Sequence, residues 1–169
     1  MITIRKAQTN DIKAIGEIYE KARNFMRSNG NNSQWSDGYP DDNDVATDIK
    51  NENAFVGEDA AGNIVMVFAF IEGLDPTYDL IEDGRWLNDR PYGTIHRLAS
   101  DGKTGGVLQA CLNFCFEKID NLRIDTHRDN RPMLAALKKA GFARCGIIYC
   151  RDGSPRIAFQ KDLTAPVQS

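Results

Sequence analysis

Hydrophobic residues recur along the chain with two different periods, and the period separates the predicted strands from the predicted helices. Residues 2–7 alternate between apolar and polar side chains, which predicts an opening strand. From Ile12 to Met26 the apolar residues return every three or four positions, which predicts a helix with one buried face. Residues 27–40 are rich in Asn, Ser and Gly and predict a loop, whereas the acidic start of 41–51 favours a short second helix.

The rest of the chain continues with strands and helices. Further strands are predicted at 54–59, 63–73, 93–100 and 121–127, helices at 104–119 and 130–142, and a closing hairpin that turns at Asp152-Gly153. The stretch 74–92 has weak periodicity, and we expect an insertion with a little extra strand. The order β-α-α-β-β-β-α-β-α-β-β predicts an α/β protein with a mixed sheet and helices on both faces. A length of 169 residues suits one domain, 1–169.

Charge and cysteine content narrow the class of protein. The net charge is −3 and no basic cluster dominates any segment, so we expect no nucleic-acid partner. No apolar run approaches the ~18 residues that span a bilayer, and the N-terminus does not have the pattern of a signal peptide. The four cysteines form no C-x-x-C pair, and two histidines are too few for a zinc site. We therefore expect a cytoplasmic protein with reduced thiols, no metal and no membrane partner.

The loop at 101–106 is the first candidate for chemistry. Gly102-Lys103-Thr104 has the form in which a nucleotide-binding P-loop ends, but Arg97 stands where the first glycine of that motif belongs. The loop still joins a strand ending at Ser100 to a helix expected near Thr104, whose first N–H groups have no partner within the helix. Gly105-Gly106 would let an anion approach that backbone. The residues alone leave two interpretations open, a pyrophosphate site and a plain strand-to-helix turn.

The order of elements, together with "DTHRDNRPMLAALKKAGFARCG" at 125–146, resembles the GCN5-related N-acetyltransferase (GNAT) family over residues 2–163. The family loop reads Arg/Gln-x-x-Gly-x-Gly/Ala. In the best register Gly105 matches the central glycine, whereas Gly102 and Val107 replace the first and last residues. The segments "NNSQWSDGYP", "IHRLAS" and "YCRDGSPRIAF" resemble a bacterial subgroup of these acetyltransferases.

The resemblance implies a GNAT-like acyl-CoA N-acyltransferase fold, with a central, mostly antiparallel mixed sheet and acetyl-CoA as co-substrate. In the family, a bulge in the strand before the loop presents a backbone N–H to the acetyl oxygen, and here that donor is expected at Leu98. An Asn at the start of the next helix often bonds the pantetheine arm. The coenzyme-binding residues implied are Leu98, Ala99, Lys103, Thr104, Gly105, Gly106, Val107 and Asn130.

Two side chains, those of His96 and Tyr149, are the main candidates for proton transfer. His96 lies on the strand that often carries the general base in this family, although it could equally be a hydrogen-bonded strand histidine. The family's usual acid, a Tyr four residues before Gly141, is replaced by Leu137. Tyr149 is the best substitute, and the alternative is a packed strand tyrosine. No cysteine lies in an obvious nucleophile environment, so direct attack by the amine is expected.

Four residues are candidates for contact with the acceptor. Trp35 and Tyr39 lie in the loop that covers the acceptor side in the family, where they could bind a ligand or anchor the loop. Alternation along the strand places Arg97 on the face opposite His96, where it could bind an acidic substrate group or, more simply, pair with Asp125. His127 could relay a proton or be solvated at a loop end.

The sequence therefore predicts an N-acetyltransferase that acts on a primary amine of a small molecule or peptide. The acidic stretch 74–92 could attract a cationic amine or be a solvated surface, and it could also mediate a homodimer. The alternative function is a non-catalytic acyl-CoA-binding module of the same fold, which Leu137 at the usual tyrosine position supports.

Overall fold

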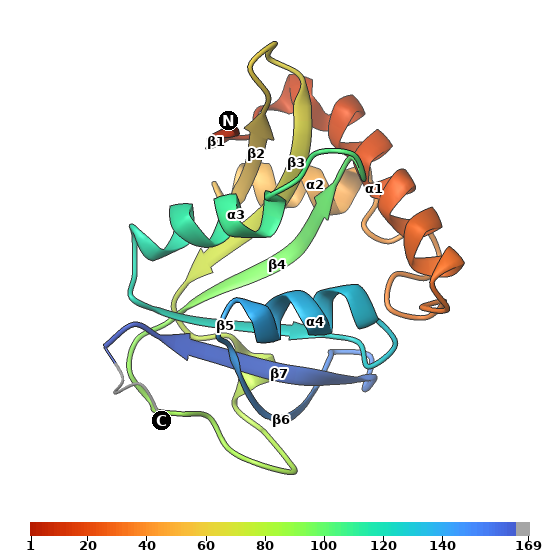
Figure 1. The fold of residues 1–169 in the computed structure, drawn as a ribbon. Coiled ribbons are helices and arrows are strands. Elements are labelled where there is room, and N and C mark those ends of the chain that lie inside the picture. The colour runs from red at the N-terminus through yellow and green to blue at the C-terminus, as the bar shows by residue number, and fades with distance from the viewer. Residues whose placement is uncertain (165–169) are drawn as a thin grey trace.

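A computed structural model describes residues 1–164 and contains the predicted order of strands and helices (Figure 1). The elements are β1 (Thr3–Lys6), η1 (Thr9–Asp11), α1 (Ile12–Ser28), α2 (Asp42–Lys50), β2 (Ala54–Glu58), β3 (Ile64–Glu72), η2 (Pro76–Tyr78), β4 (Gly93–Ser100), α3 (Val107–Phe116), β5 (Asn121–Thr126), α4 (Arg131–Lys139), β6 (Ala143–Tyr149) and β7 (Pro155–Asp162). Within the described residues no helix has both the length and the apolar character that crossing a membrane requires.

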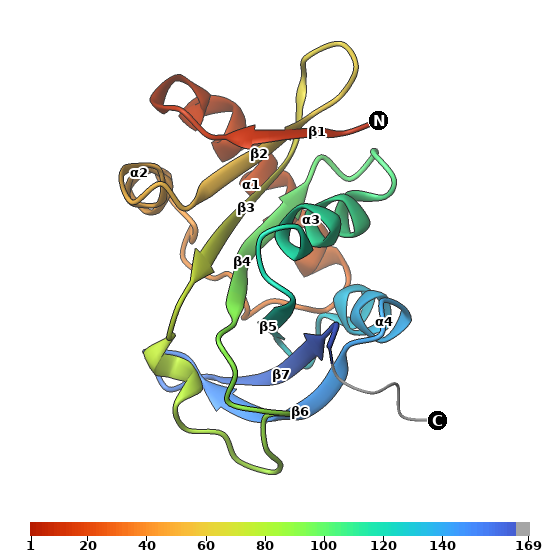
Figure 2. The same ribbon diagram turned by 90° about the vertical axis from the view of Figure 1, so that its left-hand side faces the viewer.

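The strands form one sheet in the order β1-β2-β3-β4-β5-β7-β6. All neighbours are antiparallel except β4 and β5, which run parallel. Helices α3 and α4 cover one face, and α1 and α2 cover the other (Figures 1 and 2). The expected α/β fold, a mostly antiparallel mixed sheet between two helical layers, is confirmed.

Two apolar cores lie on the two faces of the sheet. Under α3 and α4, Phe68 and Phe159 from the sheet belong to the same cluster as Leu112 and Leu137 from the helices. Leu137 is fully buried, so the position at which the family usually carries a tyrosine is a core position here. On the other face, α1 and α2 pack on β2, β3 and β4, with Ile15, Tyr19, Val45 and Val67 among the buried residues.

The insertion between β3 and β4 forms a third, aromatic core. Tyr78 and Tyr92 are buried against β6 and β7, and Trp86 packs beside them. The Arg123 guanidinium lies between two of these rings, with its carbon 4.1 Å from the Trp86 centroid and 4.0 Å from the Tyr92 centroid. Beyond the short turn η2, the only strand-like pairing of the insertion within residues 1–164 is a single bridge from Glu82 to Ile147. The aromatic residues of 74–92 therefore pack the insertion onto the sheet.

Candidate active site

The parallel ladder between β4 and β5 is short. It pairs Gly93 with Leu122 and Thr94 with Arg123, and beyond these residues the two strands diverge (Figure 1). The second half of β4 therefore has a strand partner on its β3 side only. The backbone of this half is left available for a ligand that enters between the strands.

The same half of β4 contains the bulge that the resemblance implies. Against β3, His96 pairs with Ala69 and Ala99 pairs with Val67, so Arg97 and Leu98 together oppose a single residue. Arg97 has a φ of 54°, a left-handed backbone conformation that non-glycine residues rarely adopt. The bulge places Leu98 on the side of the sheet that α3 and α4 cover, where it packs against their core.

The bulge also overturns the expected position of Arg97. Strict alternation predicts that its side chain lies opposite His96, but the extra residue turns it toward α2 instead. Its Nε and Nη2 donate to the two carboxylate oxygens of Asp48 at 2.9 and 2.7 Å. The predicted partner Asp125 is instead an acceptor for the Tyr78 hydroxyl at 2.7 Å.

Helix α1 and the α1–α2 loop also contact Arg97. The Tyr19 hydroxyl donates to the Arg97 carbonyl at 2.9 Å, and Arg97 Nη1 donates to the Tyr39 hydroxyl at 3.1 Å. Tyr39 is 38% exposed. It therefore contacts Arg97, which the sequence also predicted to contact the acceptor. Helix α1, helix α2 and the α1–α2 loop thus all hold Arg97, the residue before Leu98.

His96 is oriented by a residue that the sequence does not reveal as functional. Its Nε2 lies 2.9 Å from Asp75 Oδ2, while Asp75 Oδ1 accepts from the amide and the hydroxyl of Thr77. Burial alone would raise the pKa of Asp75, but the hydrogen bonds from His96 and Thr77 outweigh it and lower the pKa to about 2. The carboxylate is ionised at neutral pH and accepts a proton from Nε2, so the other ring nitrogen, Nδ1, is the one that could accept a proton from a substrate.

Asp75 does carry a local signal, because Asp before Pro-Thr is typical of a residue that caps a short helix. That signal predicts a cap at the start of η2, and in the structure the Thr77 amide does donate to the Asp75 side chain. It says nothing of His96, which lies 21 positions along the chain. The contact forms only because the insertion folds onto β4.

The predicted acid Tyr149 donates its hydroxyl to Glu82 at 2.8 Å, and this bond raises the pKa of Tyr149. A different tyrosine lies beside the histidine: the ring centroids of Tyr78 and His96 are 6.3 Å apart. Burial and the neighbouring Asp125 raise the pKa of Tyr78 well above its usual value. The role of Tyr149 stays a prediction.

The loop after β4 differs from its predicted form at one end. The amides of Lys103 and Thr104 both donate to Asp101 Oδ1 at 2.9 Å, and the Thr104 hydroxyl donates to Oδ2. Helix α3 therefore begins at Val107, three residues later than expected, after Gly106 in a left-handed conformation. Two of the predicted phosphate-binding amides are already satisfied by Asp101.

The following residues are open. Within residues 1–164, the amides of Gly105, Gly106 and Val107 have no protein acceptor. A Cβ built on either glycine would meet no atom within 4 Å. A surface groove of about 690 Å³ borders these glycines and Thr104 on one side and the 59–61 turn on the other. Open amides at the start of a helix are suited to an anionic group.

The sequence matches no protein-family model and no curated protein, but solved structures resemble it closely. An acetyltransferase of the GNAT family from Streptococcus agalactiae 2603 is 36% identical, with a TM-score of 0.85 and 95% of each chain covered. The chain belongs to the GNAT family of acetyltransferases.

Other members show the same fold at lower identity. A GNAT-family acetyltransferase from Listeria monocytogenes 4b F2365 is 20% identical, with a TM-score of 0.69, and covers 96% of this chain and 95% of its own. A ribosomal-protein-alanine N-acetyltransferase from Brucella melitensis is 19% identical, with a TM-score of 0.65, and covers 95% and 99%.

The two aromatic residues of the α1–α2 loop, both predicted to contact the acceptor, differ in their surroundings in this GNAT protein. Trp35 is 9% exposed and packs edge-on against Tyr19, with ring centroids 5.5 Å apart. It anchors the loop, which is the alternative that the sequence left open. Tyr39 remains accessible beside Arg97.

The same loop is bonded to the start of α4. Asn130 donates from Nδ2 to Gln34 Oε1 at 3.1 Å, while its Oδ1 accepts from the Met133 amide at 3.4 Å and caps α4. His127 accepts the Asp129 amide at Nδ1, so its Nε2 carries the proton that bonds the Ser33 hydroxyl at 3.2 Å.

The expectation of a solvated His127 at a loop end is wrong, because the residue is 8% exposed. Burial and the nearby Arg156 charge lower the pKa of His127, and the side chain is neutral at physiological pH.

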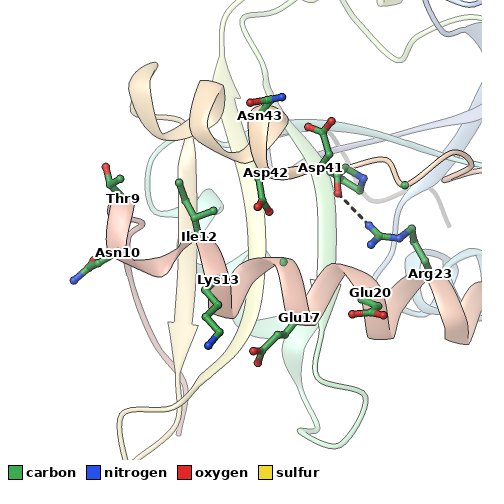
Figure 3. A pocket seen from close by; sticks show the side chains of 13 residues that line it. Thr9, Asn10, Ile12, Lys13, Glu17, Glu20, Arg23, Asp41, Asp42 and Asn43 are labelled. Carbon is green, nitrogen blue, oxygen red and sulfur yellow. Dashed lines mark hydrogen bonds between the residues drawn. The ribbon is translucent and has the colours of Figure 1, made fainter.

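A second surface depression, of about 840 Å³, lies between α1 and α2 (Figure 3). Side chains of both charges line it, among them Lys13, Glu17 and Asp42, and Arg23 donates to the Pro40 carbonyl at 3.0 Å. No predicted site residue lines this depression. Most predicted residues lie instead at the β4 bulge, in the loop at 103–107 and near the contact between the α1–α2 loop and α4. Tyr149 lies apart from them on the edge strand β6.

Proposed function

We propose that this acetyltransferase moves the acetyl group of acetyl-CoA directly to a primary amine. The observation that carries the proposal is His96, held by an ionised carboxylate one residue before the bulge that presents Leu98. A base and a carbonyl-polarising amide so close together along one strand are what amide formation from a thioester requires.

The loop fits a coenzyme diphosphate. The backbone at Gly105, Gly106 and Val107 offers unpaired amides, and the two glycines leave space in front of them. Lys103 adds a positive charge to the same loop. Acetyl-CoA would supply an activated acetyl thioester, and the bulge would place Leu98 N–H at its carbonyl oxygen.

In the proposed reaction the amine nitrogen forms a bond to the acetyl carbon and the carbon–sulfur bond breaks. The amine proton passes to His96 Nδ1, and the leaving thiolate takes a proton from Tyr149 or from solvent. Burial raises the pKa of Cys111, Cys145 and Cys150, which keeps these thiols protonated and poorly nucleophilic. That supports direct attack over a step through an acyl-cysteine.

A non-catalytic acyl-CoA-binding module remains the second candidate, because the usual tyrosine position is the buried Leu137. Thermal shift and thiol release separate the two. Acetyl-CoA should raise the melting temperature under both, whereas release of coenzyme A on addition of an amine occurs only in the enzyme.

His96→Ala is the decisive variant. It should lower kcat by about a hundredfold or more, the usual contribution of a general base, and leave the Kd for acetyl-CoA nearly unchanged. Asp79→Asn, an exposed residue of the neighbouring insertion, is the control. Unchanged turnover in His96→Ala would remove His96 from the mechanism, and no stabilisation by acetyl-CoA would contradict the whole proposal.

A further inference from the structure

One buried arginine on the proposed acceptor side has no direct contact with a carboxylate of residues 1–164. Arg156, near the start of β7, is 8% exposed. Its guanidinium donates to three neutral oxygens, the Ser154 hydroxyl at 3.2 Å and the carbonyls of Pro155 at 2.9 Å and Gln34 at 3.3 Å. No carboxylate of residues 1–164 lies within 4.0 Å of it. The Asp152 carboxylate reaches Arg156 only through the Ser154 hydroxyl, which donates to it at 2.6 Å. Buried arginines are normally paired directly, so this guanidinium can still bind an anion.

Arg156 shares a face of the sheet with the proposed base. Ala158 pairs with Asp125 across β7 and β5, and Arg156 lies two residues from Ala158, on the same face. Asp125 Oδ2 accepts from the Tyr78 hydroxyl, and the Tyr78 ring lies beside His96. Strands β4, β5 and β7 follow one another in the sheet, so His96, Asp125 and Arg156 lie on the same face of three successive strands, with β4 and β5 spread apart at His96 and Asp125.

Two other arginines of this face, Arg123 and Arg97, already have partners. Arg123, the other buried arginine of the described chain, is enclosed between the rings of Trp86 and Tyr92. Arg97 is bound to both oxygens of Asp48. His127, which directly follows β5 and whose pKa the Arg156 charge helps to lower, is neutral and does not compete for an anion.

We propose that the acceptor is a small amino acid, whose carboxylate binds Arg156 while its amine faces His96. The inference rests on the proposed function and specifies its substrate class. Asp125, between the two ends, would attract the ammonium group before it is deprotonated. A guanidinium binds a carboxylate through paired N–H donors, and in a buried site such a bond discriminates strongly against an uncharged analogue.

The test compares each amino acid with its own amide, for example glycine with glycinamide and β-alanine with β-alaninamide, in a thiol-release assay with acetyl-CoA. The kcat/KM should favour the acid by roughly tenfold to a hundredfold, the range of a charge-assisted hydrogen bond. Arg156→Gln should remove that preference by lowering kcat/KM for the acids and leaving the amides within about threefold.

Two results would overturn the inference without affecting the proposed function: amides as good as acids in the unsubstituted enzyme, or Arg156→Gln lowering both alike. The second result would show that Arg156 only fixes the loop through the Gln34 carbonyl. A second measurement uses calorimetry with coenzyme A bound. The unsubstituted protein should bind the amino acids and not their amides. If it binds neither, the inference is also refuted. If no amine of any kind releases thiol, the proposed function itself fails.

Discussion

Asp75→Asn removes one negative charge from the site and keeps the shape of the side chain. The pKa of Asp75 is lowered from 3.8 to about 2 in the folded protein. A shift of nearly two units corresponds to about 2 kcal/mol of folding free energy at 1.36 kcal/mol per unit. Because the side chain is only 18% exposed, solvent screens little of this. The variant should therefore be about 2 kcal/mol less stable than the unsubstituted protein at neutral pH.

The stability difference between Asp75→Asn and the unsubstituted protein should depend on pH in a defined direction. A carboxylate whose pKa is lowered on folding stabilises the protein fully above the unfolded pKa of 3.8, and this contribution is lost as the pH falls through about 2. The contribution of the Asp75 carboxylate should be fully present at pH 5. It should shrink as the pH falls further, because the unfolded chain then takes up the proton first.

Urea unfolding followed by tryptophan fluorescence measures the free energy of unfolding at each pH, since Trp35 and Trp86 both pack in folded cores. Asp79→Asn, exposed on the same insertion, should change stability by no more than about 0.5 kcal/mol at any pH. A loss in Asp75→Asn that is equal at pH 7 and pH 3, or no loss at all, would refute the assigned role of the His96–Asp75 bond.

Two glycine substitutions test separate parts of the structure. Gly105→Ala adds a methyl group in open space, so the free energy of unfolding should stay within about 0.5 kcal/mol of the unsubstituted value. The Kd for acetyl-CoA, measured by calorimetry, should rise about tenfold because the methyl group narrows access to the amides. An unchanged Kd would mean that the diphosphate binds elsewhere. Gly84→Ala places a Cβ 2.0 Å from the Cys145 carbonyl oxygen at a φ of 151°, and urea unfolding should show a loss of about 3 kcal/mol. Gly62→Ala, with a φ of 84° and open space, is its control and should cost only about 1 kcal/mol.

The order of elements could be predicted because each element carries its own local signal. The apolar spacing of α1 and the hairpin at Asp152-Gly153 involve residues close in sequence. The start of α3 was misplaced because the Asp101 side chain satisfies the amides of Lys103 and Thr104 and holds them outside the helix. A capping side chain of this kind can shift a helix boundary without changing the hydrophobic pattern.

Site residues could be predicted only where a single strand or loop, recognisable from its own sequence, carries them. His96 and the 105–107 loop lie at positions that the element order marks. Asp75 and Tyr78 could not be found, because the insertion that contains them has only weak periodicity and its contacts are with strands distant in sequence. The partner of Arg97 was wrong because alternation fails at a bulge, and a bulge by itself leaves no signature in hydrophobic spacing.

The contacts of Arg97 explain why the bulge persists. A left-handed conformation at a non-glycine residue costs about 1–2 kcal/mol and is retained only where its surroundings enforce it. Here the Tyr19 hydroxyl of α1 donates to the Arg97 carbonyl, and both carboxylate oxygens of Asp48 in α2 accept hydrogen bonds from the Arg97 guanidinium. These bonds fix the peptide unit on which the Leu98 N–H lies. Helices α1 and α2, which lie on the opposite face of the sheet from α3, therefore determine where the proposed carbonyl-polarising amide points.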